Sequence, residues 1–209
     1  MIEKIIESRR SVRRFKPEKP SKECIEKLVE MAIMAPSASN KQPWRFFIVD
    51  DRATIEKMAE AVQSAVDRII ENIEKEYMDA FRSYGNYFVR FVDAPVVIVP
   101  AYKSLTVLSH LVNDQINVED LRRIKIMEDN SGLISTSLAI QNLMLYAHSI
   151  GLGTSCMTGP IVALNELMEM LKIPDSWQIA ALIPVGYPDE SPATVPRKPT
   201  EAVIRWSNS

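Results

Sequence analysis

The chain has 209 residues, of which 46% are hydrophobic and 25% are charged, and its 25 basic and 27 acidic side chains give a formal net charge of −2. These values are ordinary for soluble globular proteins, so they exclude intrinsic disorder and collagen-like architecture. No stretch approaches about 18 uninterrupted apolar residues, which predicts that no helix crosses a membrane. Two cysteines are too few for a disulfide framework, and a reduced, cytoplasmic protein is expected.

The near balance of charge hides an asymmetry at the amino terminus. Residues 1–22 contain eight basic and three acidic side chains, so this segment carries +5 and the other 187 residues carry −7. A concentrated cationic segment on an acidic body suggests a small anionic ligand or an acidic partner.

The apolar pattern of the first 77 residues predicts helices and one strand. A short helix is expected over 2–9. A second helix is expected after Ser21, its N-cap, because apolar residues then recur at steps of three and four until Pro36. The apolar run 46–49 predicts a buried strand. The amphipathic segment 55–77 exceeds the usual length of a globular helix, so it is either broken or one long helix.

The remainder of the chain also mixes helices and strands, which favours an α/β or α+β class. Residues 103–128 have mixed polarity and weak periodicity, which favours an irregular excursion. The other expected elements are a strand over 95–99, a helix over 131–150 that ends at Gly151, a short run near 154–157, a helix around 165–172, a strand over 179–186 and a proline-rich tail over 188–199.

The cationic segment contains the first candidate binding motif, Arg9, Arg10, Ser11 and Arg13. Guanidinium groups and a hydroxyl at the end of a helix suit a bidentate grip on phosphate. The alternative is a solvated basic stretch near a terminus, because runs of charge usually face water.

Two further segments are rich in small or polar residues. Residues 36–44 allow close approach to a polar ring or sugar, although an ordinary helix-to-strand loop explains them equally well. Residues 151–160 hold three of the six glycines, which indicates a sharp bend or a close approach. Their start resembles a dinucleotide-binding fingerprint, but Cys156 replaces the third glycine and a helix precedes it, so that interpretation is rejected.

Conventional catalytic groups are scarce. His110 and His148 lie in no metal-ligand spacing, so no metal site is predicted. Cys156 has no histidine or charged partner near it in sequence, which disfavours a nucleophile. An enzyme with a phosphate grip and no acid or base equipment would take its chemistry from a cofactor.

Five motifs in register resemble the nitroreductase family of FMN-dependent oxidoreductases: RRSxR at 9–13, APSxxNxQPW at 35–44, AIQNLMLYA at 139–147, GLGT at 151–154 and VGYP at 185–188. The resemblance implies an α+β, nitroreductase-like fold, in which helices flank a central, mostly antiparallel sheet and two chains form an intertwined homodimer. It also implies a single FMN-binding domain over 1–209. Within it, 53–128 would be a variable substrate-pocket region, and 188–209 would extend onto the partner subunit.

The same resemblance assigns FMN-binding roles by matching position. Phosphate and ribityl contacts would come from Arg9, Arg10, Ser11, Arg13 and Arg197, with Lys198 as the alternative to Arg197. The partner subunit would supply Pro36, Ser37, Ala38 and Asn40, and the isoalloxazine ring would lie along Met157, Thr158 and Gly159. A weaker match makes Arg90 a contact of the ribityl chain or the ring. Two roles remain possible for the aromatic residues Tyr84, Tyr87, Phe88 and Phe91: they could form a lid over the flavin, or they could pack in the core.

The implied activity is ping-pong hydride transfer from NADH or NADPH through flavin N5 to a nitroaromatic, quinone or similar small acceptor. No catalytic side chain is expected, because the flavin carries the chemistry. The alternatives are a non-enzymatic FMN-binding protein for storage or redox sensing, or a dehalogenase, ene-reductase or flavin-destroying enzyme on the same fold. Neither nucleic acid nor membrane is expected as a partner.

Overall fold

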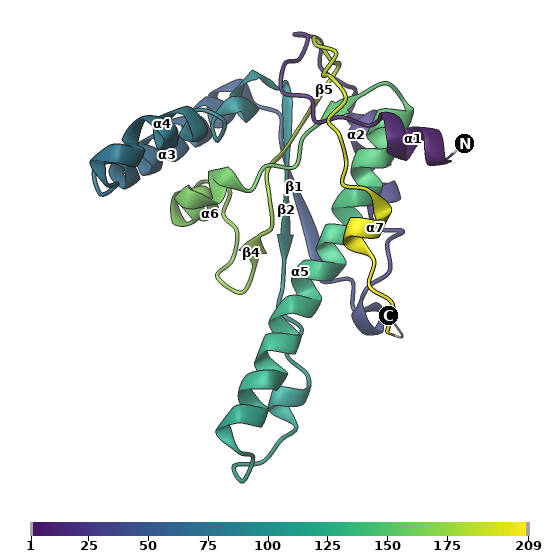
Figure 1. Ribbon diagram of the computed structural model, residues 1–209, viewed down its shortest axis with the longest axis vertical. Coiled ribbons are helices and arrows are strands. Elements are labelled where there is room, and N and C mark those ends of the chain that lie inside the picture. The colour runs from purple at the N-terminus through teal and green to yellow at the C-terminus, as the bar shows by residue number, and fades with distance from the viewer. Residues whose placement is uncertain (1, 208–209) are drawn as a thin grey trace.

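The computed structural model describes residues 2–207 and has three layers, with helices on both faces of one sheet (Figure 1). The strands are β1 (Trp44–Val49), β2 (Val96–Tyr102), β3 (Gly153–Thr154), β4 (Gln178–Ile179) and β5 (Ile183–Gly186). Their order is β1-β2-β5-β3, and β4 also pairs with β2. Every pairing between these strands is antiparallel, which confirms the expected α+β class.

The helices divide between the two faces of the sheet. One face is covered by α2 (Lys22–Ala32) and α5 (Val118–Ser149), and the other by α3 (Arg52–Ile70) and α6 (Leu164–Met170). The shorter helices are α1 (Ile2–Ser8), α4 (Met78–Gly85) and α7 (Thr200–Val203). Short 3-10 turns are η1 (Ala38–Asn40), η2 (Lys75–Tyr77), η3 (Arg90–Asp93), η4 (Leu108–His110) and η5 (Gly159–Ala163).

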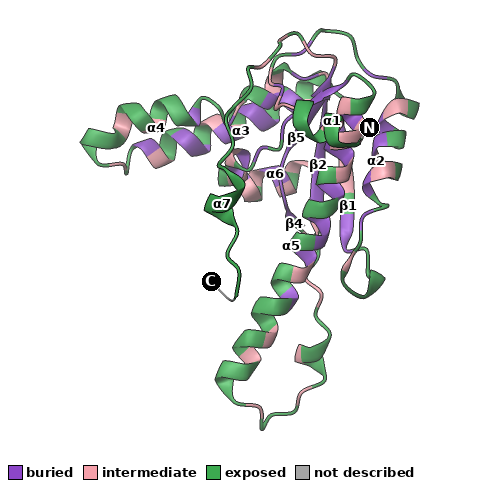
Figure 2. Ribbon diagram, turned by 45° about the vertical axis from the view of Figure 1, so that its right-hand side comes forward, coloured by how far each residue is buried: buried purple, intermediate pink, exposed green. Residues whose placement is uncertain are grey.

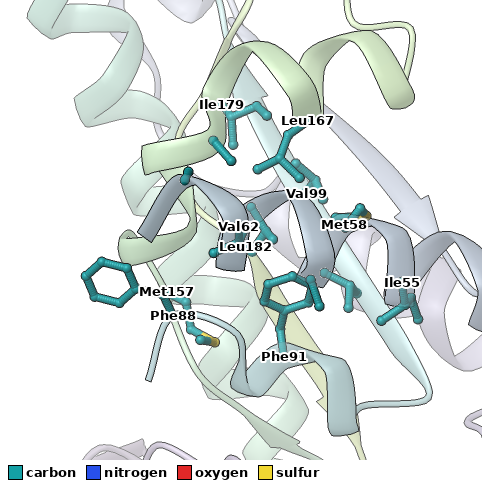
Figure 3. Close-up of a cluster of buried hydrophobic side chains, with 14 of the residues drawn as sticks. Ile55, Met58, Val62, Phe88, Phe91, Val99, Met157, Leu167, Ile179 and Leu182 are labelled. Atoms are coloured by element: carbon teal, nitrogen blue, oxygen red, sulfur yellow. The ribbon is translucent and has the colours of Figure 1, made fainter. Parts of the chain in front are cut away.

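Strand β2 is buried on both faces because its side chains alternate between two cores. Val97 and Val99 enter the cluster under α3 and α6, whereas Val96 and Ile98 enter the cluster under α2 and α5. This position explains why the strand is a continuous apolar run. Figure 3 shows the first cluster, in which the Phe91 ring points toward α3.

The structure confirms one predicted helix start and shows where two predicted segments are broken. The Ser21 side chain accepts a hydrogen bond from the Cys24 amide at 3.2 Å, as expected of the N-cap of α2. The amphipathic segment 55–77 is broken, since α3 ends at Ile70 and α4 begins at Met78. The predicted strand over 179–186 is interrupted, because its register against β2 shifts by one residue between the pairs Ile98–Ile183 and Ala101–Ile179.

The expectation of an irregular excursion over 103–128 is wrong for its second half. Helix α5 begins at Val118, where Asn117 accepts a hydrogen bond from the Asp120 amide at 2.8 Å. Its first turns project beyond the sheet and are largely exposed, as the green part of α5 in Figure 2 shows. Because solvent surrounds these turns on most sides, the sequence has little reason to carry an amphipathic period there.

Membrane insertion by a helix has no basis in the described part of the chain. None of the helices within residues 2–207 is both long enough and apolar enough to cross a membrane.

Candidate functional site

The segment after α1 runs along the end of the sheet. The Val12 amide donates to the Thr154 carbonyl at 3.0 Å, and the Lys16 amide donates to the Tyr187 carbonyl at 2.9 Å. The close approach requires Gly153, since a Cβ there would lie 2.7 Å from the Val12 side chain. This pairing places Arg13 beside the segment that follows β3.

A cavity of about 310 Å³ adjoins Arg13. Residues 155–160 form one wall, so the predicted ring contacts Met157, Thr158 and Gly159 share a cavity with Arg13. Aromatic residues also line it, namely Tyr84, Tyr87 and Phe88. A second cavity of about 540 Å³, between α5 and residues 178–181, also contains Cys156 and Thr158, so the two hollows meet at these residues.

The aromatic wall divides into buried and exposed members. Phe88 and Phe91 belong to the core, whereas Tyr84 and Tyr87 are exposed at the cavity. Phe88 packs so closely against Gly159 that only glycine fits there, because a Cβ would lie 2.2 Å from the Phe88 ring. The Arg90 guanidinium lies over the Tyr87 ring, 4.5 Å from its centroid, so its charge is next to this wall.

Arg9, Arg10 and Arg197 bring positive charge together near Cys156, which lines the cavity together with Arg13. Burial lowers the pKa of Arg9, and the charges of Arg197 and Arg10 lower it further. Among residues 2–207, none of Arg9, Arg13 and Arg197 takes part in an ion pair. Mutual repulsion of neighbouring cations is relieved by a bound anion, so this cluster suits a phosphate.

Arg10 differs from its neighbours because protein groups already engage its guanidinium. It donates to the carbonyls of Glu7 and Arg9 at 2.6 and 2.8 Å and to the Thr194 hydroxyl at 3.1 Å. Arg10 therefore adds charge to the cluster while it holds the C-terminal tail in place.

Glu190, in the C-terminal tail, binds the segment that carries Arg13. One of its carboxylate oxygens accepts hydrogen bonds from the amides of Arg13 and Arg14, at 2.5 and 3.0 Å. The other lies 3.5 Å from the Arg14 guanidinium. Burial opposes ionisation of Glu190, but these two amides and the Arg14 charge together lower its pKa. The carboxylate positions the tail that brings Arg197 to Arg9.

Replacing Glu190 with glutamine is expected to lower the free energy of unfolding by about 1–2 kcal/mol at pH 7, because the charge that strengthens these hydrogen bonds is lost. Since the native pKa of Glu190 lies below the usual value of about 4.3, the wild-type advantage is present above that pH and is lost as the pH falls through the native pKa. Urea unfolding at pH 7 and in acid measures both effects. Glu201→Gln, on the exposed helix α7, is the control, and a difference independent of pH would contradict the assignment.

Pro36, Ser37, Ala38 and Asn40 lie at the other end of the sheet. Trp44, which follows them, pairs with Tyr102 at one end of β2, whereas β5 pairs with Val96 at the other end. The length of β2 separates these ends by roughly 20 Å at about 3.3 Å per residue. One chain therefore does not bring this loop to its own arginine cluster.

The loop itself has an unusual backbone that α5 supports. Ser39, Asn40 and Gln42 have φ values of 49°, 52° and 48°, a left-handed conformation that non-glycine residues rarely adopt. The Ala38 amide donates to the Ser135 hydroxyl of α5 at 3.3 Å, and the Gln42 amide donates to the Ser37 hydroxyl at 3.0 Å. Strained backbone of this kind concentrates at functional sites.

Another cavity, of about 580 Å³, is elsewhere, between α2 and β1. Its charged groups already pair with one another, since Lys19 meets Asp50 at 2.5 Å and Lys22 meets Glu26 at 3.7 Å. It therefore offers less unbalanced charge to a ligand than the smaller cavity beside Arg13.

Two residues at the site were missed from sequence. Cys156 lines both hollows, and burial raises the pKa of its thiol although Arg9 lowers it, so the thiol is protonated at neutral pH. Glu190 had no local signal, because its partners lie 176 and 177 residues away. The structure gives His148 a packing role, with its Nε2 2.7 Å from the Ser8 hydroxyl.

The antiparallel sheet between two helical layers, with an arginine cluster beside a cavity, defines an α+β protein whose site has the charge to suit a small anionic ligand. Residues 6–187 match the model of the Nitroreductase family, so the chain belongs to that family. It is 28% identical to an iodotyrosine deiodinase of Thermotoga neapolitana, over 99% of this chain and 98% of that protein. Other relatives at 28% identity are described as putative NAD(P)H nitroreductases.

Solved structures share the fold. A BluB-like flavoprotein from Clostridium difficile has a TM-score of 0.87 at 24% identity, over 99% of this chain and 98% of that one. An iodotyrosine deiodinase bound to FMN and 3-iodo-L-tyrosine has a TM-score of 0.73 at 24% identity and is matched over 100% of both chains.

Proposed function

We propose that this protein binds FMN and is an FMN-dependent NAD(P)H oxidoreductase that reduces a nitroaromatic, quinone or similar small acceptor in the cytoplasm. The observation that carries the proposal is the cluster of Arg9, Arg10 and Arg197, whose charges repel one another beside the cavity of Arg13. FMN is named for two structural neighbours and NAD(P)H for several relatives, which supports this choice of cofactor and donor.

The charge and the small residues of the site support its assignment to FMN. Arg9, Arg13 and Arg197 would bind the phosphate end, with Ser11 beside them, while Arg10 contributes charge and holds the tail. Residues 157–159 would border the ring. Gly159 has no Cβ, which leaves room for the Phe88 ring beside it. Bound FMN would supply hydride transfer from NADH or NADPH to the acceptor, so the chain needs no acid or base of its own.

The proposal includes a homodimer in which residues 36–40 of one protomer complete the flavin site of the other. The separation of this loop from the arginine cluster within one chain supports it. The tail also exposes Val195, Val203 and Ile204, apolar side chains that a partner would cover. Sedimentation of a folded, FMN-loaded monomer would contradict the shared site.

The purified protein tests the cofactor and the reaction in turn. It should carry the visible absorbance of oxidised flavin, and anaerobic NADH or NADPH should bleach that band within seconds. A colourless protein that does not take up FMN contradicts the proposal. Flavin that neither nicotinamide reduces would instead indicate a protein that stores or senses FMN.

A second candidate is reductive dehalogenation, which the likeness to the deiodinase favours. Protein reduced with dithionite and mixed anaerobically with 3-iodo-L-tyrosine should release iodide if this reaction is its own. An acceptor screen on the same reduced protein compares quinones and nitroaromatics with the iodinated substrate.

A further inference from the structure

A fourth cavity lies beside the strained loop of residues 36–42. Its volume is about 360 Å³, and it is lined by Ala38, Ser39 and Lys41 of this loop, by Leu105, Val107 and Leu108, and by Met127, Glu128 and Ser131 of α5. Most of its wall is apolar, with Leu105, Leu108 and Met127 among the lining residues. This volume is within the range of small-molecule sites, about 300–1,000 Å³.

Glu128 supplies a carboxylate to this cavity although the residue is only 2% exposed. Its Oε1 atom accepts hydrogen bonds from the amides of Val107 and Ser109, at 2.6 and 3.1 Å. Its Oε2 atom is buried and has no hydrogen-bond partner among residues 2–207. A buried acceptor without a partner is unfavourable, and more so when it carries charge.

The carboxylate is ionised at neutral pH. Burial opposes its ionisation, but the Ser109 hydroxyl and the amides of residues 107–109 lower the pKa of Glu128 below its usual value. No ion pair within the described chain neutralises it, and Lys41, which lines the same cavity, is not within 4.0 Å of it. A cationic N–H donor forms a stronger hydrogen bond to such an oxygen than a neutral donor does.

We propose that Glu128 is a recognition site for the ammonium group of a small primary amine whose apolar body fills this cavity. One open oxygen matches one ammonium group, and apolar walls strengthen the charged contact by excluding water. The inference rests on the proposed function in one respect: Ala38 lines the cavity and is expected to face the flavin of the partner subunit. An amine held here by its cationic end would then be a substrate that the flavin reduces.

Direct binding tests the site without any turnover. Isothermal titration calorimetry of the purified protein with benzylamine, a cation at neutral pH, and with benzyl alcohol, a neutral probe of similar size, compares the two donors. We expect benzylamine to bind more tightly by on the order of 10- to 100-fold. Glu128→Gln should reduce this ratio to about one. Equal affinity in the wild-type protein, or no binding of either probe, overturns the proposal without reference to any variant.

Turnover tests the link to the flavin separately. The flavin-loaded protein should reduce 4-nitrobenzylamine with a higher kcat/KM than 4-nitrobenzyl alcohol by a similar factor, and Glu128→Gln should remove the preference. Glu119→Gln, on the exposed start of α5, is the matched control and should keep it. A preference that persists in Glu128→Gln overturns the assignment. Absence of flavin, or flavin that NAD(P)H does not reduce, rejects the proposed function instead, and the calorimetric comparison still decides the amine site.

Discussion

Replacing Arg9 and Arg13 together with alanine should weaken FMN binding by about 10²- to 10⁴-fold. Each guanidinium would form a charge-assisted contact of about 1.5–3 kcal/mol, and every 1.4 kcal/mol corresponds to about tenfold in affinity. Neither arginine takes part in an ion pair in the described chain, so truncation leaves no carboxylate without its partner. Flavin fluorescence during titration of flavin-free protein measures the dissociation constant.

The matched control removes two positive charges from an exposed surface near the same end of the chain. Lys22→Ala combined with Lys27→Ala lowers the net charge equally, but these side chains only pair with Glu26 and Glu30 on α2. Its FMN affinity should stay within a few-fold of wild type at moderate salt, where distant charges are screened. If the arginine variant also keeps its affinity, the cationic segment is a solvated surface and the proposed grip is wrong.

Replacing Phe91 with alanine should lower the free energy of unfolding by about 3–5 kcal/mol, a large part of the stability of a small domain. Phe91 is 0% exposed and lies in the cluster under α3, with Ile55, Met58 and Leu182 (Figure 3). The truncation removes a buried ring and leaves a cavity that rigid neighbours fill only partly. Phe88, three residues earlier, is expected to shift with it and to alter the wall beside Gly159. Urea denaturation measures the loss.

Tyr77→Ala supplies the comparison for this change. It also truncates an aromatic side chain, but Tyr77 is 60% exposed in η2, so the expected change is within about 0.5 kcal/mol. Equal losses in the two variants would contradict the placement of Phe91 at the centre of the core.

Several elements could be predicted because their causes are local. Ser21 caps α2 through an amide three residues away, and the apolar run of β2 reflects burial on both faces. The start of α5 could not be predicted, because an exposed helix carries no apolar period. The break in the 179–186 segment was equally hidden, since it comes from a one-residue shift of register against β2, between the pairs Ile98–Ile183 and Ala101–Ile179.

In the candidate site, too, the features with local causes could be predicted and those that depend on distant residues could not. The residue types at 9–13 indicated a phosphate grip, whereas the membership of Arg197 came only from the family resemblance. Its proximity to Arg9 depends on the tail that Glu190 and Arg10 hold in place. No pattern pointed to Glu128, because a lone acidic residue on a helix ordinarily faces water.

By itself, the sequence determined the cationic amino terminus, the local helices and strands, and the motifs that identify the family. These depend on residue chemistry and on neighbours within a few positions along the chain. The tertiary structure decided which charges meet and which remain unpaired. Arg9 meets Arg197 and Glu190 meets the Arg13 amide because the sheet brings distant segments to one end, while the 36–42 loop begins at the other. Contacts of this range depend on the path of the whole chain, which no local pattern encodes.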